Sequence, residues 1–217
     1  MKKIFLIFIG LVLSVGAISD AFCGPRYRLQ ETMKPFSNYT MGNKQANGVF
    51  KVLDSETGKI LFFKRTYNQE IDATRKAGLI DFGNSPIIHI VRIADLDDAG
   101  IERAVQEIGL MVPKYVRADR WLVTEKIPDG DTLLSVVIHQ GYLGDGTQIT
   151  IEEIDQIIRE LKVMRNAGIN HTDLYRNIIL HREDDGKLQA YILDFEGAGT
   201  QGVDYIESEL EDLRERL

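Results

Sequence analysis

The chain has 217 residues, of which 44% are hydrophobic and 27% charged, and this composition excludes an intrinsically disordered protein. The formal net charge of −7 excludes nucleic acid as the main partner, because contacts to phosphates require concentrated Lys and Arg. Cys23 is the single cysteine, which excludes an internal disulfide framework.

Residues 1–23 have the form of a secretory signal peptide. Two lysines follow Met1, an apolar run covers residues 4–15, and small residues continue to Ala21. The apolar run is too short to span a bilayer comfortably. We therefore expect an exported protein, cleaved after Ala21 or Cys23, with no stable membrane insertion afterwards. An uncleaved membrane anchor is the alternative.

The next segment predicts an irregular lead-in over residues 24–40 and then a hairpin. Gly42 and Gly48 bound a polar turn that leads into a strand over 49–53. A turn-forming sequence, Asp-Ser-Glu-Thr-Gly, joins this strand to a second one over 59–64.

The second strand ends in Lys64, and a predicted helix over 68–77 carries Glu70 in its first turn. A lysine at a strand end is often a solvated edge residue. An acidic residue in the first turn of a helix is favoured by the helix dipole. A functional and a structural interpretation of both residues stay open at this point.

The middle of the chain predicts four elements. A strand over 86–92, a helix over 98–110 and a strand over 121–127 precede the break at 128–130. Thr150 and Glu153 form a capping box that opens a helix through residue 166. Apolar residues at helical spacing predict that one face of this helix is core: Ile151, Ile154, Ile158, Leu161 and Met164 or Val163.

Residues 171–196 carry the strongest chemical signal. Two short strands, 177–181 and 190–194, flank a turn-rich segment and predict a hairpin. The hairpin brings Asp173, Asn177 and Asp194 to one end. One carboxylate can accept a hydroxyl proton, while the amide and the other carboxylate offer the hard oxygen ligands that Mg²⁺ prefers. Ordinary turn or surface carboxylates are the alternative.

These motifs resemble the eukaryotic-type protein kinase superfamily. His171-Thr172-Asp173-Leu174 matches the start of its catalytic loop, and Asp194-Phe195 matches two of the three residues of its Asp-Phe-Gly metal motif. The interval from Asp173 to Asn177 is one residue shorter than the family pattern, and Glu196 replaces the glycine.

The resemblance implies ATP and Mg²⁺ as cofactors and a role for each candidate residue. It assigns the catalytic base to Asp173, the phosphate-binding lysine to Lys64 and its orienting partner to Glu70. Asn177 and Asp194 would bind the metal. The remaining candidates are Gly42 and Gly48 in the phosphate-covering loop, and the backbone of Glu125 and Ile127 at the adenine.

The resemblance also implies an α+β fold, namely a minimal two-lobed protein-kinase-like fold with a truncated C-lobe. A kinase-like domain would cover 24–217, with the N-lobe over 38–124, the hinge at 125–128 and the C-lobe over 129–217. Only 23 residues follow Asp194, ending in a helix over 204–217, so the usual platform for peptide substrates is missing. We expect a monomer.

Pared-down kinases of this kind are similar to secreted bacterial effector kinases of the OspG, NleH and HopBF types. That similarity implies Ser/Thr phosphorylation of a host protein in the host cytoplasm, or activation by a host protein. Three alternatives stay open: a pseudokinase that binds without catalysis, a nucleotidyl transferase, and a small-molecule kinase.

Overall fold

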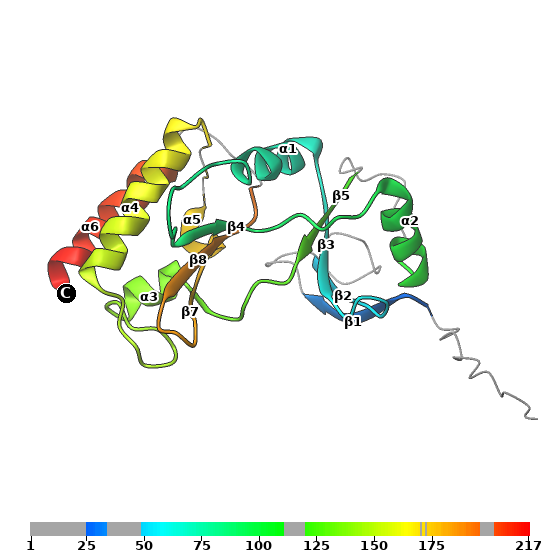
Figure 1. Ribbon diagram of the computed structural model, residues 1–217, viewed down its shortest axis with the longest axis horizontal. Coiled ribbons are helices and arrows are strands. Elements are labelled where there is room, and N and C mark those ends of the chain that lie inside the picture. The colour runs from blue at the N-terminus through cyan, green and yellow to red at the C-terminus, as the bar shows by residue number, and fades with distance from the viewer. Residues whose placement is uncertain (1–24, 34–48, 111–119, 170, 172, 196–201) are drawn as a thin grey trace, which may run out of the picture.

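The computed structural model describes residues 25–33, 49–110, 120–169, 171, 173–195 and 202–217. These residues form two α+β lobes, each built on its own four-stranded sheet (Figure 1). The predicted α+β class and two-lobed arrangement are therefore confirmed. Within the described residues, no helix combines the length and the apolar character needed to cross a bilayer.

The first lobe is an antiparallel sheet covered by one helix. Its strand order is β1 (Tyr27–Met33), β2 (Val49–Asp54), β3 (Ile60–Thr66) and β5 (Arg120–Glu125). Inward-facing residues alternate with half-buried ones along β2 and β3, as expected for strands with one face in a core. The helix α2 (Asp98–Glu107) lies beside this sheet in Figure 1 and contributes Ala104 and Val105 to its core.

The second lobe combines a mixed sheet with helices. The strand order is β4 (Ile88–Ile90), β8 (Leu188–Ile192), β7 (Ile178–Arg182) and β6 (Asp131–Thr132), and β4 runs parallel to β8. Its helices are α3 (Leu133–Ile138), α4 (Ile151–Asn166), α5 (Leu174–Asn177) and α6 (Gly202–Arg216). The helices α4 and α6 pack side by side, at the end of the molecule that carries the C-terminus (Figure 1).

The helix α1 (Asn68–Ala77) links the two lobes. It follows β3 of the first sheet, yet its last residue, Ala77, is fully buried in the hydrophobic core of the second lobe. Ala73 on the same helix packs against that core as well. A helix that belongs to the first lobe by connectivity is thus seated on the second lobe by packing.

Most predicted elements are present. The strands on either side of the 54–58 turn and the helix over 68–77 form where the sequence placed them, and the predicted hairpin forms as Ile178–Arg182 and Leu188–Ile192, shifted by one or two residues. The Thr150 side chain accepts from the Glu153 backbone N–H, and the Glu153 side chain accepts from the Thr150 N–H, which completes the predicted capping box.

Three predictions about the fold are wrong. The lead-in over 24–40 is not irregular throughout, because Tyr27–Met33 forms β1 against β2. Ile151 is exposed rather than core, whereas Ile157 is fully buried, because the apolar stripe of α4 lies further round the helix; of the alternatives Met164 and Val163, Met164 is the buried one. Asn177 ends α5 instead of opening a strand.

The strand predicted over 86–92 is shorter, Ile88–Ile90, and it belongs to the second sheet. The range 38–124 expected for the N-lobe therefore contains one strand of the other lobe, and β1 lies before that range begins. The truncated C-lobe contains four strands, two of which, β4 and β6, join the predicted hairpin to form its sheet.

Candidate functional site

Lys64 is the centre of the site. Its ammonium lies 3.0 Å from Glu70 Oε1 and 2.5 Å from Asp194 Oδ1. The three side chains come from β3, α1 and the segment after β8, so residues 130 positions apart in sequence meet at the junction of the lobes. The structure thereby brings together three of the predicted site residues.

Local packing explains how Glu70 reaches Lys64. The Glu70 side chain is only 1% exposed. The Thr66 hydroxyl donates to Glu70 Oε2, and the Thr74 hydroxyl donates to the Glu70 backbone oxygen over 2.8 Å. The carboxylate therefore has a hydroxyl on one oxygen and the Lys64 ammonium on the other, which fixes its orientation.

Burial and charge act in opposite directions on this pair. Burial lowers the pKa of Lys64, but attraction to Glu70 and Asp194 and the hydrogen bonds to both outweigh it, so that pKa lies above its ordinary value. Burial raises the pKa of Glu70, and Lys64 and Thr66 offset only part of that effect. The ammonium has two carboxylate partners while Glu70 has one cation, which accounts for the difference.

Asp194 has an unusual backbone conformation. Its φ is +59°, which lies in the left-handed region that residues other than glycine seldom adopt. Glu196, which replaces the glycine of the family motif, lies outside the described residues, and the left-handed residue in the described part of the motif is Asp194. Strain of this kind persists where surrounding contacts hold it, and here Phe195 is buried directly after it.

His171 connects the two segments that carry the acidic residues. It is fully buried, its Nε2 lies 2.9 Å from the Leu193 backbone oxygen, and its Nδ1 accepts from the Asp173 N–H over 3.1 Å. Because Nδ1 accepts, the ring proton is on Nε2 and donates to Leu193. Phe195 packs edge-on against the ring. Burial lowers the pKa of His171, which favours the neutral ring that bridges the two segments.

Asp173 directly precedes α5, and Asn177 is the last residue of that helix. The Asp173 side chain is exposed, and the Asn177 side-chain nitrogen donates to the Asp173 backbone oxygen over 2.8 Å. That bond uses the amide nitrogen of Asn177 and leaves its oxygen as an acceptor. An amide oxygen and the Asp194 carboxylate are ligands that suit Mg²⁺, so this pair fits a magnesium ion.

The remaining predicted residues lie at the hinge or outside the described chain. The Glu125 backbone N–H donates to Arg92 O and its side chain pairs with Lys59 at 2.7 Å. Ile127 is half-buried beyond the end of β5. Their adenine-binding role stays a prediction. Gly42 and Gly48 lie outside the described residues.

Gly130, just after the hinge, has a structural role that the sequence did not reveal. A Cβ placed on it would come within 2.2 Å of the Leu180 backbone oxygen. The backbone of the hinge thus runs directly against β7, where only glycine fits. This contact fixes where the second lobe begins relative to the β7–β8 hairpin.

Sequence reasoning also missed Thr66 and Thr74. Thr66, at the end of β3, donates to the Glu70 carboxylate, and Thr74, one turn after Glu70 on α1, donates to its backbone oxygen. Only Thr74 could have been anticipated, from its i+4 position on the predicted helix; the contact of Thr66 depends on how β3 and α1 meet.

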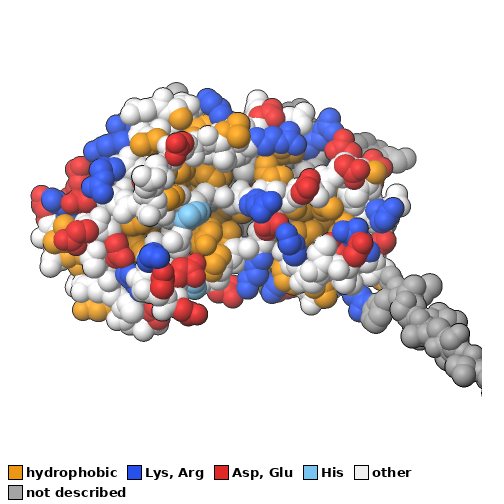
Figure 2. All heavy atoms as spheres, in the orientation of Figure 1, with side chains coloured by type: hydrophobic (Ala, Val, Ile, Leu, Met, Phe, Trp, Pro, Cys, Tyr) orange, Lys and Arg blue, Asp and Glu red, His pale blue; other side chains and the backbone are white. Residues whose placement is uncertain are grey.

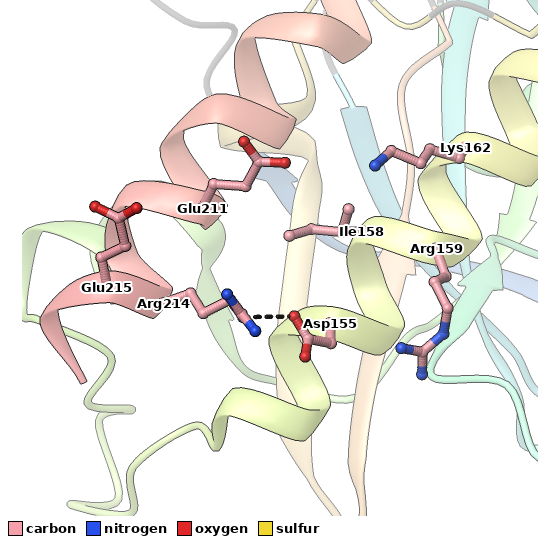
Figure 3. A pocket seen from close by; sticks show the side chains of 7 residues that line it. All are labelled: Asp155, Ile158, Arg159, Lys162, Glu211, Arg214 and Glu215. Carbon is pink, nitrogen blue, oxygen red and sulfur yellow. Dashed lines mark ion pairs between the residues drawn. The ribbon is translucent and has the colours of Figure 1, made fainter.

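Surface charge does not single out the site. The face shown in Figure 2 mixes acidic and basic side chains, with hydrophobic side chains reaching the surface between the lobes. A separate hollow lies between α4 and α6, where Arg214 pairs with Asp155 at 2.7 Å and Arg159, Lys162 and Glu211 also line it (Figure 3). None of the predicted site residues lines that hollow.

Two lobes that meet at a largely buried lysine–glutamate pair, with a carboxylate after a β-hairpin, form the kinase-like arrangement that the sequence motifs predicted. Many solved structures match the chain, 642 in all. One is the crystal structure of the Rad53 kinase domain and SCD2 in complex with AMPPNP, at 20% identity and a TM-score of 0.38. That match covers 68% of this chain and 46% of the Rad53 chain, so this chain spans about half the length of the Rad53 chain.

The sequence profile of the lipopolysaccharide kinase (Kdo/WaaP) family matches residues 101–216, which is more than half of the chain. The chain therefore belongs to this family. No curated protein matches the chain.

Proposed function

We propose that the protein transfers the γ-phosphoryl group of ATP to a hydroxyl of a saccharide. The observation that carries this proposal is the contact of Lys64 with both Glu70 and Asp194, in a chain that belongs to a family of lipopolysaccharide kinases. The contact supplies a phosphate-binding cation, and the family supplies the acceptor class.

Each side chain has a distinct part in this proposal. Lys64 would bind the α- and β-phosphates, and Glu70 would keep the ammonium directed toward them. Asp173 would accept the proton of the acceptor hydroxyl as its oxygen bonds to the γ-phosphorus, while the bond from that phosphorus to the leaving ADP oxygen breaks. The exposed position of Asp173 suits a group that must meet an incoming acceptor.

Asp194 and Asn177 are the residues that would hold Mg²⁺. The metal, when bound, neutralises phosphate charge. In the free protein the Asp194 carboxylate contacts Lys64. Its side chain is 37% exposed, so it remains accessible from solvent.

The test is phosphate transfer by the purified mature chain. The protein is incubated with labelled ATP, Mg²⁺ and purified lipopolysaccharide, beside Asp173→Asn and the exposed-site control Glu152→Gln. We expect label in the saccharide with the parent and the control, and about 10²–10⁴-fold less with Asp173→Asn. Binding of nucleotide without any transfer to saccharide would overturn the saccharide proposal.

A second candidate is a secreted Ser/Thr protein kinase that acts on a host protein. The signal-like residues 1–23, outside the described residues, support export, and export would deliver the enzyme to another cell. Labelled host-cell lysate, analysed for phosphoserine and phosphothreonine, distinguishes this candidate from the first. Nucleotide binding with no transfer to either acceptor would instead favour a pseudokinase, and a mass gain of AMP would favour a nucleotidyl transferase.

A further inference from the structure

Glu160 is a buried carboxylate on α4, and it is not one of the residues assigned to the site. Glu160 is only 5% exposed. Carboxylates are almost never fully buried unless they are paired or hydrogen-bonded. The partners of this one therefore indicate what it does.

Those partners are N–H groups of the segment that enters β4. The backbone N–H of Ile88 donates to Glu160 Oε2 over 2.6 Å, and the N–H of Ile87 lies 3.1 Å from both carboxylate oxygens. Gln156, one turn earlier on α4, donates to Glu160 Oε1 over 2.8 Å and to the Ser85 backbone oxygen over 2.9 Å. We name this set, Gln156 and Glu160 with the backbone of residues 85–88, the α4 clamp.

The α4 clamp holds a backbone that would not adopt its shape unaided. Ser85 has a φ of +53°, which is unfavourable for a residue with a side chain. Directly after it, the Ile87 oxygen accepts from Ala190 N over 2.8 Å, and Val91 N donates to Ile192 O over 2.9 Å. The clamped segment is therefore fixed between α4 on one side and β8, two residues before Asp194, on the other.

The same segment determines where α1 sits. Only ten residues separate Ala77, the last residue of α1, from the clamped Ile88. Ile80 and Phe82, in that connection, pack against the core that contains both Ala77 and Ile88. Both ends of the connection are thus anchored on the second lobe. The C-terminal end of α1 is one of them, and Glu70 lies on the same helix in contact with Lys64.

We infer that Glu160 is a positioning residue, which acts through the 85–88 segment and α1 to keep Glu70 directed at Lys64. The expected effect on KM rests on the proposed phosphotransferase function, whereas the positioning of α1 does not. Its consequence is that the nucleotide-binding side of the site is assembled in the free protein, with no partner required to move α1 inward.

Three variants of the full chain test the inference. Glu160→Gln replaces one acceptor oxygen by an N–H₂ group that faces backbone donors, and Gln156→Ala removes the supporting amide only. Glu152→Gln, on the exposed first turn of α4, makes the same charge change away from the clamp. Hydrogen exchange of residues 68–77 is the primary readout, because it reports on α1 whether or not the protein has transferase activity.

We expect Glu160→Gln to accelerate exchange in α1 and in residues 85–91 while α6 stays protected, and Gln156→Ala to do so more weakly. If the protein is the kinase proposed above, the KM for ATP rises roughly tenfold and the KM for the acceptor does not change, as expected when a phosphate-binding group is displaced slightly. Glu152→Gln should match the parent in every measurement.

Exchange that increases at residues 85–91 alone, with α1 as protected as in the parent, would overturn the inference. If Glu160→Gln fails to fold, the same decision is made with Gln156→Ala. Absence of transferase activity in the parent would refute the proposed function, yet the exchange data would still decide whether Glu160 positions α1.

Discussion

The two halves of the candidate site are built differently. Lys64 and Glu70 are largely buried, with Thr66 completing the contacts of Glu70. Asp173 is exposed, and the Asn177 side chain donates a hydrogen bond to the Asp173 backbone oxygen, not to its carboxylate. A pre-built nucleotide side beside an open acceptor side indicates that the chain fixes the phosphate donor by its own packing and leaves the acceptor hydroxyl to be oriented on binding.

The sharpest test of this difference is Asp173→Asn. An exposed base can be lost without disturbing the nucleotide side, so we expect transfer to fall by about 10²–10⁴-fold. Nucleotide affinity, measured by titration with a non-hydrolysable ATP analogue, should be unchanged. A parallel loss of nucleotide affinity would show that the two halves are not separable.

Lys64→Met should break the other half. Removal of the ammonium leaves the buried Glu70 carboxylate without its cation and removes the phosphate contact, so transfer should fall roughly 10²-fold or more. Here, unlike at Asp173, nucleotide affinity and thermal stability should both decrease. Calorimetric titration and a melting curve measure the two effects, and retention of full nucleotide affinity would contradict the role given to Lys64.

His171→Gln addresses the group that joins the halves. In the folded protein the pKa of His171 lies below its ordinary value of 6.5, so the folded state binds fewer protons than the unfolded state between the two values. Stability is therefore complete above pH 6.5 and declines as the pH falls through that range. The variant, which cannot titrate there, should lose about 1–2 kcal/mol at neutral pH and show a flatter decline on acidification.

Urea unfolding at several pH values between 5 and 8 measures this profile. An identical pH dependence in the variant and the parent would mean that another group is responsible for the decline.

Thr66→Val is expected to have the smallest effect. It removes the hydroxyl that donates to Glu70 while keeping the shape of the side chain, and a hydrogen bond of this kind contributes about 1 kcal/mol net. The KM for ATP should rise about fivefold at most. Measured beside Asp173→Asn, it shows whether small changes on the buried side alter nucleotide binding while the KM for the acceptor remains constant.

Much of this arrangement can be predicted from sequence because it depends on local pattern. Alternation around the 54–58 turn, the Thr150 and Glu153 capping box, and the motif residues at 171–174 and 194–195 each report on neighbours in the chain. The meeting of Lys64 with Asp194 was also predicted, through the order of motifs typical of a known superfamily.

The rest depends on contacts that no local pattern encodes. The position of β4 in the sequence assigns it to the first lobe, but its partner strand β8 lies 100 residues later. Glu160 looks like an ordinary acidic residue on an amphipathic helix until Ile87 and Ile88 are placed beside it. The exposure of Ile151 and Val163 likewise follows from how α4 is turned against α6 and the second sheet.

Because β4 belongs to the sheet of the second lobe, the chain cannot be cut into two fragments that each contain one whole lobe. The chain passes from one lobe to the other before β4, again after it, and a third time at residues 126–130 (Figure 1). The piece before the last passage would carry an apolar strand with no sheet to join, and the piece after it would have an uncovered sheet edge along β8. Neither would be an independent folding unit, and a cut at 126–130 should leave a pair of fragments that complement each other.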